Sequence, residues 1–160
     1  MIFGSFAIIN IKGRFLFLKR ERDALWDIAG GGFDINETDY KKVAIREVSE
    51  EAGIIIKPEQ LNLIAVLSQK LKKEDAEKYR VSNGFLYLHS LFLFEETEIL
   101  LSSEHTEYKL FEYKEIIEDY RNFKSGPLWM YFTFLEHQRT NKLQEGPLSE
   151  RRFWQGKEYL

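Results

Sequence analysis

The sequence predicts a single domain, residues 1–160, in which helices cover a β-sheet, so the fold is of the α/β or α+β class. One observation behind this prediction is that strand-like apolar runs and segments of helical periodicity occur in the same short chain. The other is size and composition: 160 residues, 44% hydrophobic and 15% aromatic, suit one domain with a large core. Residues 141–160 are the segment that could extend beyond this domain.

Five segments are predicted as strands from their length and their apolar content. The first two are joined through Lys12 and Gly13, a tight connection typical of a hairpin. Turn residues mark where the third and fourth begin, Pro58 before one and Gly84 before the other. The predicted strands are Phe3–Ile11, Arg14–Lys19, Leu61–Leu67, Phe85–Phe94 and Tyr108–Tyr113.

A helix is predicted over Asp39–Ala52, because apolar residues recur there at about 3.6-residue spacing. The recurring residues are Ala44, Ile45, Val48 and Ala52. The hydroxyl of Thr38 is expected to cap the first turn, and Gly53 can take a left-handed conformation after the last one. Upstream of this helix, Gly30–Gly32 interrupt the chain and indicate a turn.

Two further segments complete the predicted elements. Lys70–Arg80 is dense in charge and is expected to be either a loop or a short exposed helix. After Gly126 and Pro127, helical spacing returns at Leu128, Tyr131, Phe132 and Leu135. This apolar helix either packs internally or forms the interface of a homodimer.

Charge and composition exclude several classes of function. Lys and Arg total 23 against 26 Asp and Glu, and this balance argues against a broad binding surface for RNA or an anionic membrane. Cysteine is absent, which excludes disulfides, thiolate metal sites and a cysteine nucleophile. The apolar run at the N-terminus lacks a basic leader and is too short to span a membrane. A cytoplasmic protein is therefore expected, with any metal bound to oxygen or imidazole.

Three glutamates stand out on the predicted helix of residues 39–52. Glu47, Glu50 and Glu51 occupy positions i, i+3 and i+4 and therefore share one face. Like charges at this spacing repel each other, and a divalent cation between them would remove the repulsion. Mg²⁺ prefers carboxylate oxygens and completes its shell with water and substrate phosphate oxygens. Taken alone, however, such a cluster is more typical of a solvated helix face.

The surrounding sequence favours the metal-binding interpretation. From Gly31 it reads GGFDINE, TDYKKVAI and REVSEEAGI, which resembles the Nudix box G-x5-E-x7-R-E-U-x-E-E-x-G-U, where U is aliphatic. The second half matches at every defined position: Arg46, Glu47, Val48, Glu50, Glu51, Gly53 and Ile54. The resemblance to the Nudix hydrolase family implies its α/β fold, an α/β/α sandwich with a mixed sheet between helices. It also implies Mg²⁺-dependent diphosphate hydrolysis, with Mn²⁺ as a substitute.

The first half of the box departs from the pattern in two ways. Gly31 and Glu37 have the right mutual spacing, but eight residues instead of seven separate Glu37 from the box arginine. Counting back from that arginine puts Gly32 at the glycine position and Thr38 at the first glutamate, so the role of the first acidic residue stays open. In addition, Ala29 stands where the family often has a proline before two glycines, which predicts a looser loop.

The resemblance also suggests a role for each matching residue. Glu50 and Glu51 would be metal ligands, and Glu47 would be a further ligand or the general base. Arg46 would orient this cluster of carboxylates. The carbonyl of Gly30 would add a backbone ligand to the metal.

Residues outside the helical half of the box are expected to contact the substrate or complete the catalytic set. Gly31 and Gly32 lack side chains and would let the backbone approach the substrate phosphates. Arg20 is the cation chosen to bind phosphate, from a set that also includes Arg22, Lys70, Lys72, Lys73 and Arg80. The segment Ser102–Glu107 looks like the family's E-H-x-E motif. Glu104 is its first catalytic candidate and Glu107 its second, while the histidine between them is expected to be an ordinary loop residue.

The residues and the resemblance together predict hydrolysis of a phosphoanhydride bond in a nucleoside-diphosphate-linked substrate, of the nucleoside triphosphate or nucleotide sugar class. Markers of two other substrate classes are absent: no proline lies near Gln69, as in ADP-ribose pyrophosphatases, and no tyrosine near Leu71, as in dinucleoside-polyphosphate hydrolases. The alternative is a Nudix-fold sensor or interaction module that binds nucleotide without turnover, which would not need three clustered carboxylates. Hydrolysis of RNA 5′ ends would require a basic groove that the net charge of −3 does not promise.

Overall fold

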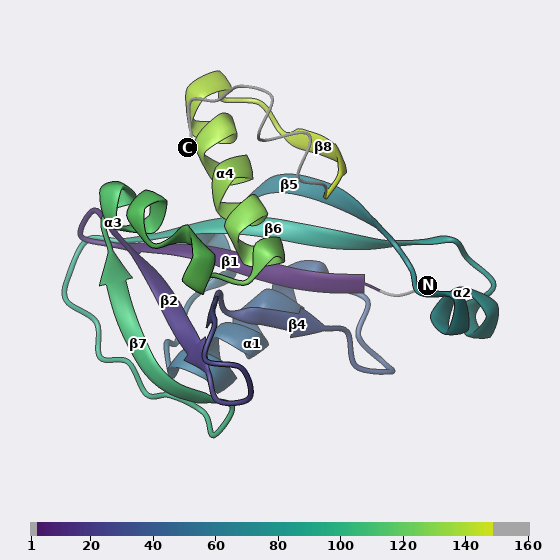
Figure 1. Cartoon of the computed structure of the whole chain (residues 1–160), viewed down its shortest axis with the longest axis horizontal. Helices are drawn as coiled ribbons and strands as arrows, with labels where there is room; N and C mark the ends of the chain where they lie inside the picture. The colour runs from purple at the N-terminus through teal and green to yellow at the C-terminus, as the bar shows by residue number, and fades with distance from the viewer. Residues whose placement is uncertain (1–2, 149–160) are drawn as a thin grey trace.

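The computed structural model describes residues 3–148, and within them a mixed sheet of eight strands carries helices on both faces (Figure 1). The strands are β1 (Phe3–Ile11), β2 (Arg14–Arg20), β3 (Trp26–Asp27), β4 (Gly30–Gly32), β5 (Leu61–Lys70), β6 (Asn83–Leu93), β7 (His105–Phe111) and β8 (Gln144–Pro147). The helices are α1 (Tyr40–Ala52), α2 (Lys73–Tyr79), α3 (Tyr113–Glu118) and α4 (Ser125–Thr140), with 3₁₀ turns at Pro58–Gln60 and Tyr120–Asn122.

The sheet is organised around β1. Its strand order is β3-β2-β1-β6-β5-β8, and β4 pairs with β1 while β7 pairs with β2. β1 runs parallel to β6 and β5 runs parallel to β8, whereas the other pairs are antiparallel. The predicted mixed sheet is therefore confirmed.

The predicted hairpin between β1 and β2 is also confirmed, with Ile11 opposite Arg14. Lys12 and Gly13 have φ angles of 52° and 87°. Two successive positive φ angles are typical of the tight turns that follow the right-handed twist of paired strands. The side chain of Asn10 fastens the turn, because its Oδ1 accepts a hydrogen bond of 2.9 Å from the N–H of Gly13.

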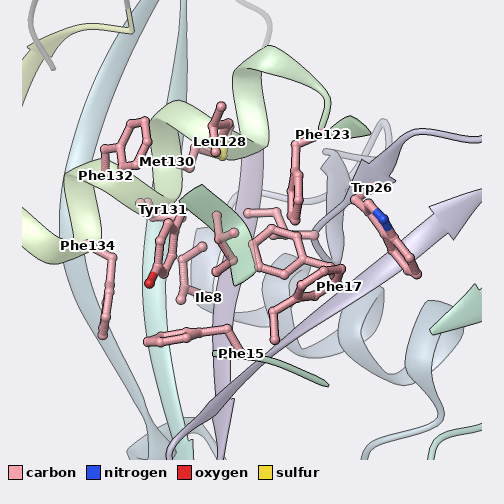
Figure 2. Close-up of a cluster of buried hydrophobic side chains, with 14 of the residues drawn as sticks. Ile8, Phe15, Phe17, Trp26, Phe123, Leu128, Met130, Tyr131, Phe132 and Phe134 are labelled. Carbon is pink, nitrogen blue, oxygen red and sulfur yellow. The ribbon is translucent and has the colours of Figure 1, made fainter. Parts of the chain in front are cut away.

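Side chains alternate between two cores, one on each face of the sheet. On β2, Phe15 and Phe17 enter the core under α4, whereas Leu16 and Leu18 enter the core under α1. The α4 side is rich in aromatic rings, and Figure 2 shows Phe17 among the rings of this cluster. The rings of Phe17 and Phe123 lie edge to face with their centroids 4.8 Å apart, a favoured arrangement for aromatic pairs. The two cores establish the α/β/α sandwich.

The C-terminal helix begins two residues earlier than Pro127 and packs internally. Pro127 stands in the first turn of α4, where its missing N–H would have no helical partner. Leu128, Met130 and Tyr131 are buried against the sheet, and Figure 2 shows them above Phe15 and Phe17. The homodimer stays a prediction that this packing does not require.

Four other predicted segments had different outcomes. Of the two alternatives for Lys70–Arg80, the short exposed helix is observed, as α2. The strand expected over Tyr108–Tyr113 is instead β7, His105–Phe111. It ends earlier because Glu112 caps α3, its N–H bonding the carboxylate of Glu115 at 2.8 Å, so that Tyr113 is already helical. The strands predicted at Leu61–Leu67 and Phe85–Phe94 are observed as β5, which continues to Lys70, and β6, which begins at Asn83 and ends at Leu93.

Part of the C-terminal segment, 141–160, belongs to the sheet, because Gln144–Pro147 pair with β5 as β8. Residues 149–160 lie outside the described part of the chain. None of the helices within residues 3–148 is long and apolar enough to cross a membrane.

Candidate active site

The helix that carries the predicted carboxylates, α1, is capped at both ends. Asp39 caps the first turn, with Oδ1 accepting hydrogen bonds from the N–H groups of Lys41 at 2.9 Å and Lys42 at 3.2 Å. The expectation that Thr38 would cap was wrong by one residue, because the helix begins at Tyr40 and its cap must immediately precede it. Gly53 ends α1 with a φ of 68°, the left-handed conformation predicted for it.

The buried face of α1 determines where the glutamates point. Its buried residues are Val43, Ala44, Val48 and Ala52, and the two alanines let the helix approach the sheet closely. The side chains of Glu47 and Glu51 are consequently partly buried, and that of Glu47 is only 12% exposed. The side chain of Glu50, one turn along, is 57% exposed. The helical spacing places the three glutamates on one face, but Glu47 and Glu51 are more buried than Glu50.

The three glycines expected to form a turn are instead a short strand, β4, paired with Gly4, Ser5 and Phe6 of β1. A strand forms because glycine alone leaves room for its neighbours. A Cβ on Gly30, whose φ is 154°, would lie 2.3 Å from Cδ1 of Phe6, and a Cβ on Gly31 would lie 2.5 Å from Oε1 of Glu47. The segment predicted to be looser is tied to β1 as well, since the carbonyl of Ala29 accepts a hydrogen bond from Ala7 at 3.0 Å. β4 thus brings backbone directly against the carboxylates of α1.

Arg46 gathers the acidic residues around its guanidinium group. Its Nη1 lies 3.0 Å from carboxylate oxygens of both Glu47 and Glu50. Its Nη2 also donates to the carbonyl of Gly32 at 3.1 Å. Hydrogen bonding to Glu37, together with the negative charges of Glu47 and Glu37, raises the pKa of Arg46. The arginine is therefore always charged and holds two of the three glutamates in fixed positions.

Glu37 supplies the strongest contact to Arg46. Its two carboxylate oxygens accept from Nε and Nη2 of the arginine, each at 2.9 Å. The hydrogen bonds from Arg46 hold the pKa of Glu37 below its ordinary value. Of the two alignments left open for the first half of the box, Glu37 is thus the one whose side chain reaches the arginine, whereas Thr38 is exposed.

Glu51 stands apart from this network and is the most strongly perturbed carboxyl group of the site. Its Oε2 accepts a hydrogen bond of 2.8 Å from the N–H of Gly30. Burial raises its pKa to about 8, and the negative charges of Glu47, Asp27 and Glu104 add to that rise. Burial also raises the pKa of Glu47. No ion pair involves Glu51 among the residues that the structure describes, so no neighbouring cation opposes this rise in its pKa.

A cavity of about 460 Å³ opens beside Glu51 and Gly30. Its charged lining is mixed, with four carboxylates and three cations: Glu21, Asp27, Glu51, Glu104, Arg20, Arg22 and Lys124. Arg20, the cation chosen from the sequence to bind phosphate, lines this cavity with Gly30 and Glu51, and it is buried and paired with Asp23 at 3.2 Å. The lysines considered on Lys70–Arg80 do not line this cavity.

The E-H-x-E segment divides between two places. Glu104 lines the cavity, and its negative charge influences Glu51. Glu107 lies on β7 and its carboxylate is 3.4 Å from Nζ of Lys19. His105 is the first residue of β7 and is buried, not a loop residue as expected, and burial lowers its pKa. Glu104 is therefore the acid that the fold brings near the box.

Asp27 and Lys124, like Glu21, line the cavity but have no role in the sequence prediction. Asp27 follows Trp26 in β3, and Lys124 precedes α4. Their side chains meet at 3.8 Å, although they lie far apart in the chain. Neither belongs to a motif, so only the tertiary fold identifies them.

The NUDIX domain family model matches residues 2–132 of the chain. The chain belongs to the Nudix family. The family match supports a diphosphate hydrolase. None of the curated proteins matches the sequence.

Solved structures share the Nudix fold at low sequence identity. The MutT protein from Methanosarcina mazei Go1 superposes with a TM-score of 0.65 and 23% identity, covering 88% of this chain and 95% of that one. A C. elegans Ap4A hydrolase in a binary complex gives a TM-score of 0.64 and 20% identity, covering 87% and 98%. A bifunctional NMN adenylyltransferase/ADP ribose pyrophosphatase from Francisella tularensis, complexed with AMP and a Mn ion, gives 0.64 and 16%, covering 86% and 41%.

Some of these proteins are much longer. The chain spans 42% of the length of a MutT/nudix family protein from Enterococcus faecalis, besides the 41% of the F. tularensis enzyme. The shared part is the Nudix fold.

Nudix hydrolases generally use a divalent cation, and the donors of this site suit one. Carboxylate and carbonyl oxygens are the ligands that Mg²⁺ prefers. As the side chains stand, no three Asp, Glu or His residues between 3 and 148 are gathered closely enough to hold an ion. Arg46 holds Glu47 and Glu50, while Glu51 bonds to Gly30. The donor set still fits, because Glu51 is buried among like charges that a cation would offset.

Proposed function

We propose that this Nudix protein hydrolyses a phosphoanhydride bond in a nucleoside-diphosphate-linked substrate, of the nucleoside triphosphate or nucleotide sugar class, with Mg²⁺ as its cofactor. The observation that carries the proposal is the cavity of about 460 Å³, in which the box residue Glu51 faces the same space as Arg20 and Lys124. Carboxylates that suit a metal and cations that suit phosphate line the same cavity. Phosphoryl chemistry requires this combination.

Each residue of the box has a role in this proposal. Glu50 and Glu51, with Glu47 and the carbonyl of Gly30, would hold the cation. When bound, the cation supplies charge neutralisation for the diphosphate and activation of a water molecule. Arg46 keeps Glu47 and Glu50 in place through its contacts at 3.0 Å. Gly31 and Gly32 leave the backbone of β4 open to the substrate.

The proton of the attacking water needs an acceptor. Glu47 and Glu104 are the candidates, Glu47 because it lies against β4 and Glu104 because it lines the cavity beside Glu51. A carboxylate within reach of the water can act as the general base. Substituting each by Gln separates them, because loss of the base lowers kcat and shifts its pH dependence.

A second cavity, of about 260 Å³, supports a nucleoside as the group attached to the diphosphate. It adjoins the first, and both linings include Phe6, Asp27 and Lys124. Leu86 and Met130 contribute apolar surface to it. An apolar pocket beside a charged one suits a substrate with a flat organic group and a phosphate chain. The AMP complex of the F. tularensis protein is in keeping with this substrate class.

Hydrolysis measured with and without Mg²⁺ tests the proposal over nucleoside triphosphates, nucleotide sugars, dinucleoside polyphosphates and RNA with a 5′ triphosphate or cap. Glu50→Gln and Glu51→Gln should each lower kcat by about a hundredfold or more, because each removes a charged metal ligand. Glu77→Gln is the control, since Glu77 lies on α2 with its side chain 69% exposed. Mn²⁺ should restore activity after chelation as Mg²⁺ does.

Undiminished hydrolysis by both Glu50→Gln and Glu51→Gln would refute the proposed chemistry. A protein that binds nucleotide but turns over no substrate would instead be the sensor or interaction module. Turnover confined to RNA ends, with salt-dependent binding, would redirect the substrate class to RNA.

A further inference from the structure

Asp27 lies between two cations that reach the charged cavity from different parts of the chain. Its Oδ1 accepts a hydrogen bond of 2.8 Å from the N–H of Ile28. Its Oδ2 lies 3.6 Å from Nη1 of Arg20 and 3.8 Å from Nζ of Lys124. One oxygen therefore faces both cations, and all three side chains line the cavity of about 460 Å³.

Backbone contacts fasten Lys124 to β3. The carbonyl of Trp26 accepts a hydrogen bond of 2.9 Å from the N–H of Lys124. Trp26 also forms a parallel bridge with Phe123, and both of these aromatic residues are buried. Because β3 in turn pairs with β2, which ends at Arg20, the two cations are brought to the same carboxylate by regular backbone pairing.

Exposure differs among the three side chains. Arg20 is 8% exposed and Asp27 is 16% exposed, whereas Lys124 is 41% exposed. Burial raises the pKa of Asp27, and the positive charge of Lys124 opposes that rise. A half-exposed lysine 3.8 Å from its partner contributes little to folding stability. Lys124 is therefore held near the cavity, and its ammonium group can bind a ligand there.

Lys124 also lies where the charged and the apolar cavities meet. Both linings include Lys124, Asp27 and Phe6. A substrate with its phosphates in the first cavity and its organic group in the second would pass next to the ammonium group of Lys124. Hydrogen bonds from an ammonium group to phosphate oxygens are charge-assisted and strong.

We propose that Lys124 binds the phosphate chain of the substrate and that Asp27 is the positioning residue that holds Lys124 and Arg20 at the same cavity. The inference rests on the proposed diphosphate hydrolysis and deepens it, because it assigns the phosphate chain to the junction between β3 and α4.

Binding of methylenediphosphonate, a diphosphate in which carbon replaces the bridging oxygen, tests this assignment without turnover. Calorimetric titration in Mg²⁺ would compare the wild type with Lys124→Met, Lys124→Arg and Asp27→Asn. Met keeps the length of lysine without its charge, and Asn keeps an acceptor for the N–H of Ile28 without the charge of the carboxylate. Lys114→Met is the control, because Lys114 is 83% exposed on α3, with Nζ 3.7 Å from Glu118.

Lys124→Met should raise Kd by about tenfold or more, the effect of losing one charge-assisted hydrogen bond. Lys124→Arg should recover most of that loss, and Lys114→Met should bind as the wild type does. Asp27→Asn should raise Kd by a smaller factor, since both cations remain but lose their common anchor. On any substrate that the hydrolysis screen finds, both Lys124→Met and Asp27→Asn should raise KM more than they lower kcat.

A wild type that does not bind methylenediphosphonate would overturn the proposal, and so would unchanged affinity in Lys124→Met or an equal loss in Lys114→Met. If Asp27→Asn lowers the melting temperature but leaves Kd unchanged, the positioning role is wrong and Asp27 only links β3 to α4. A wild type that binds the diphosphonate but hydrolyses no screened substrate would sink the proposed function and leave the binding assignment standing.

Discussion

Acidification should destabilise the fold through His89, whose side chain is 0% exposed in the middle of β6. Its Nδ1 lies 3.2 Å from the carbonyl oxygen of Phe6, so the neutral ring can donate a hydrogen bond there. Its Nε2 is buried without a hydrogen-bond partner among the described residues. Burial lowers the pKa of His89 from 6.5 to about 4, because a charged imidazolium would lose its hydration.

The pH dependence follows from the difference between folded and unfolded chains. As the pH falls from 6.5 towards 4, the unfolded chain binds a proton at this histidine and the folded chain does not, so the free energy of unfolding decreases. Above about pH 7 the ring of His89 is neutral in both states, and its full contribution to the free energy of unfolding is present. The difference in the pKa of His89, from 6.5 to about 4, lowers the free energy of unfolding by roughly 3 kcal/mol in the acid limit and by roughly 2 kcal/mol at pH 5.

Urea unfolding at pH 7.5 and pH 5, followed by tryptophan fluorescence, measures this effect in the wild type and in His89→Asn. Asparagine retains an N–H donor near the position of Nδ1 but cannot be protonated. The wild type should lose about 2 kcal/mol more than the variant between the two pH values. Titrating carboxyl groups such as Glu51 cancel in this comparison, because both proteins contain them. Equal losses in the two proteins would refute the reasoning.

Gly30→Ala should lower the free energy of unfolding by roughly 2 kcal/mol or more, because its Cβ would meet Phe6 at 2.3 Å, whereas Gly126→Ala, with nothing within 4 Å, should not. Urea denaturation of both variants compares them directly, and equal stabilities would contradict the clash. Glu37→Gln should lower kcat by roughly tenfold by weakening the grip on the box arginine, with Thr38→Ala as a control that keeps wild-type activity. Steady-state kinetics that rank the two in the opposite order would show that the second alignment is correct.

Local patterns were sufficient where one segment carries its own signal. The hairpin of β1 and β2 was predictable because two apolar runs flank a lysine and a glycine, and α1 because its apolar period and Gly53 coincide. Thr38 and Asp39 are both good capping residues in adjacent positions, so the pattern could not choose between them. The choice depends on the residue at which the backbone turns helical.

The short strands were not predictable by the same means. β4 consists of three glycines, which have no hydrophobic pattern and are depleted in strands. It fits between β1 and α1 because a Cβ on Gly30 would collide with Phe6 and one on Gly31 would collide with Glu47, and these neighbours are known only from the folded structure. β3 has only two residues, too few to show a pattern. The role of Asp27 depends on Lys124, which lies near it only in the folded chain.

The loop between β4 and α1 accommodates the extra residue in the box. Between β4 and α1 the N–H of Glu37 bonds to the carbonyl of Asp34 at 2.9 Å, and the N–H of Asp34 bonds back to the carboxylate of Glu37 at 2.8 Å. This local turn takes up chain length before α1 begins and leaves the carboxylate of Glu37 on Arg46 at 2.9 Å. The contact that matters is therefore set by where a side chain ends in space, and a loop can change its length by one residue without losing that contact. A departure in loop spacing is accordingly weaker evidence against the site than a departure within the helix, where one added residue would rotate Glu47 and Glu51 by about 100° away from β4.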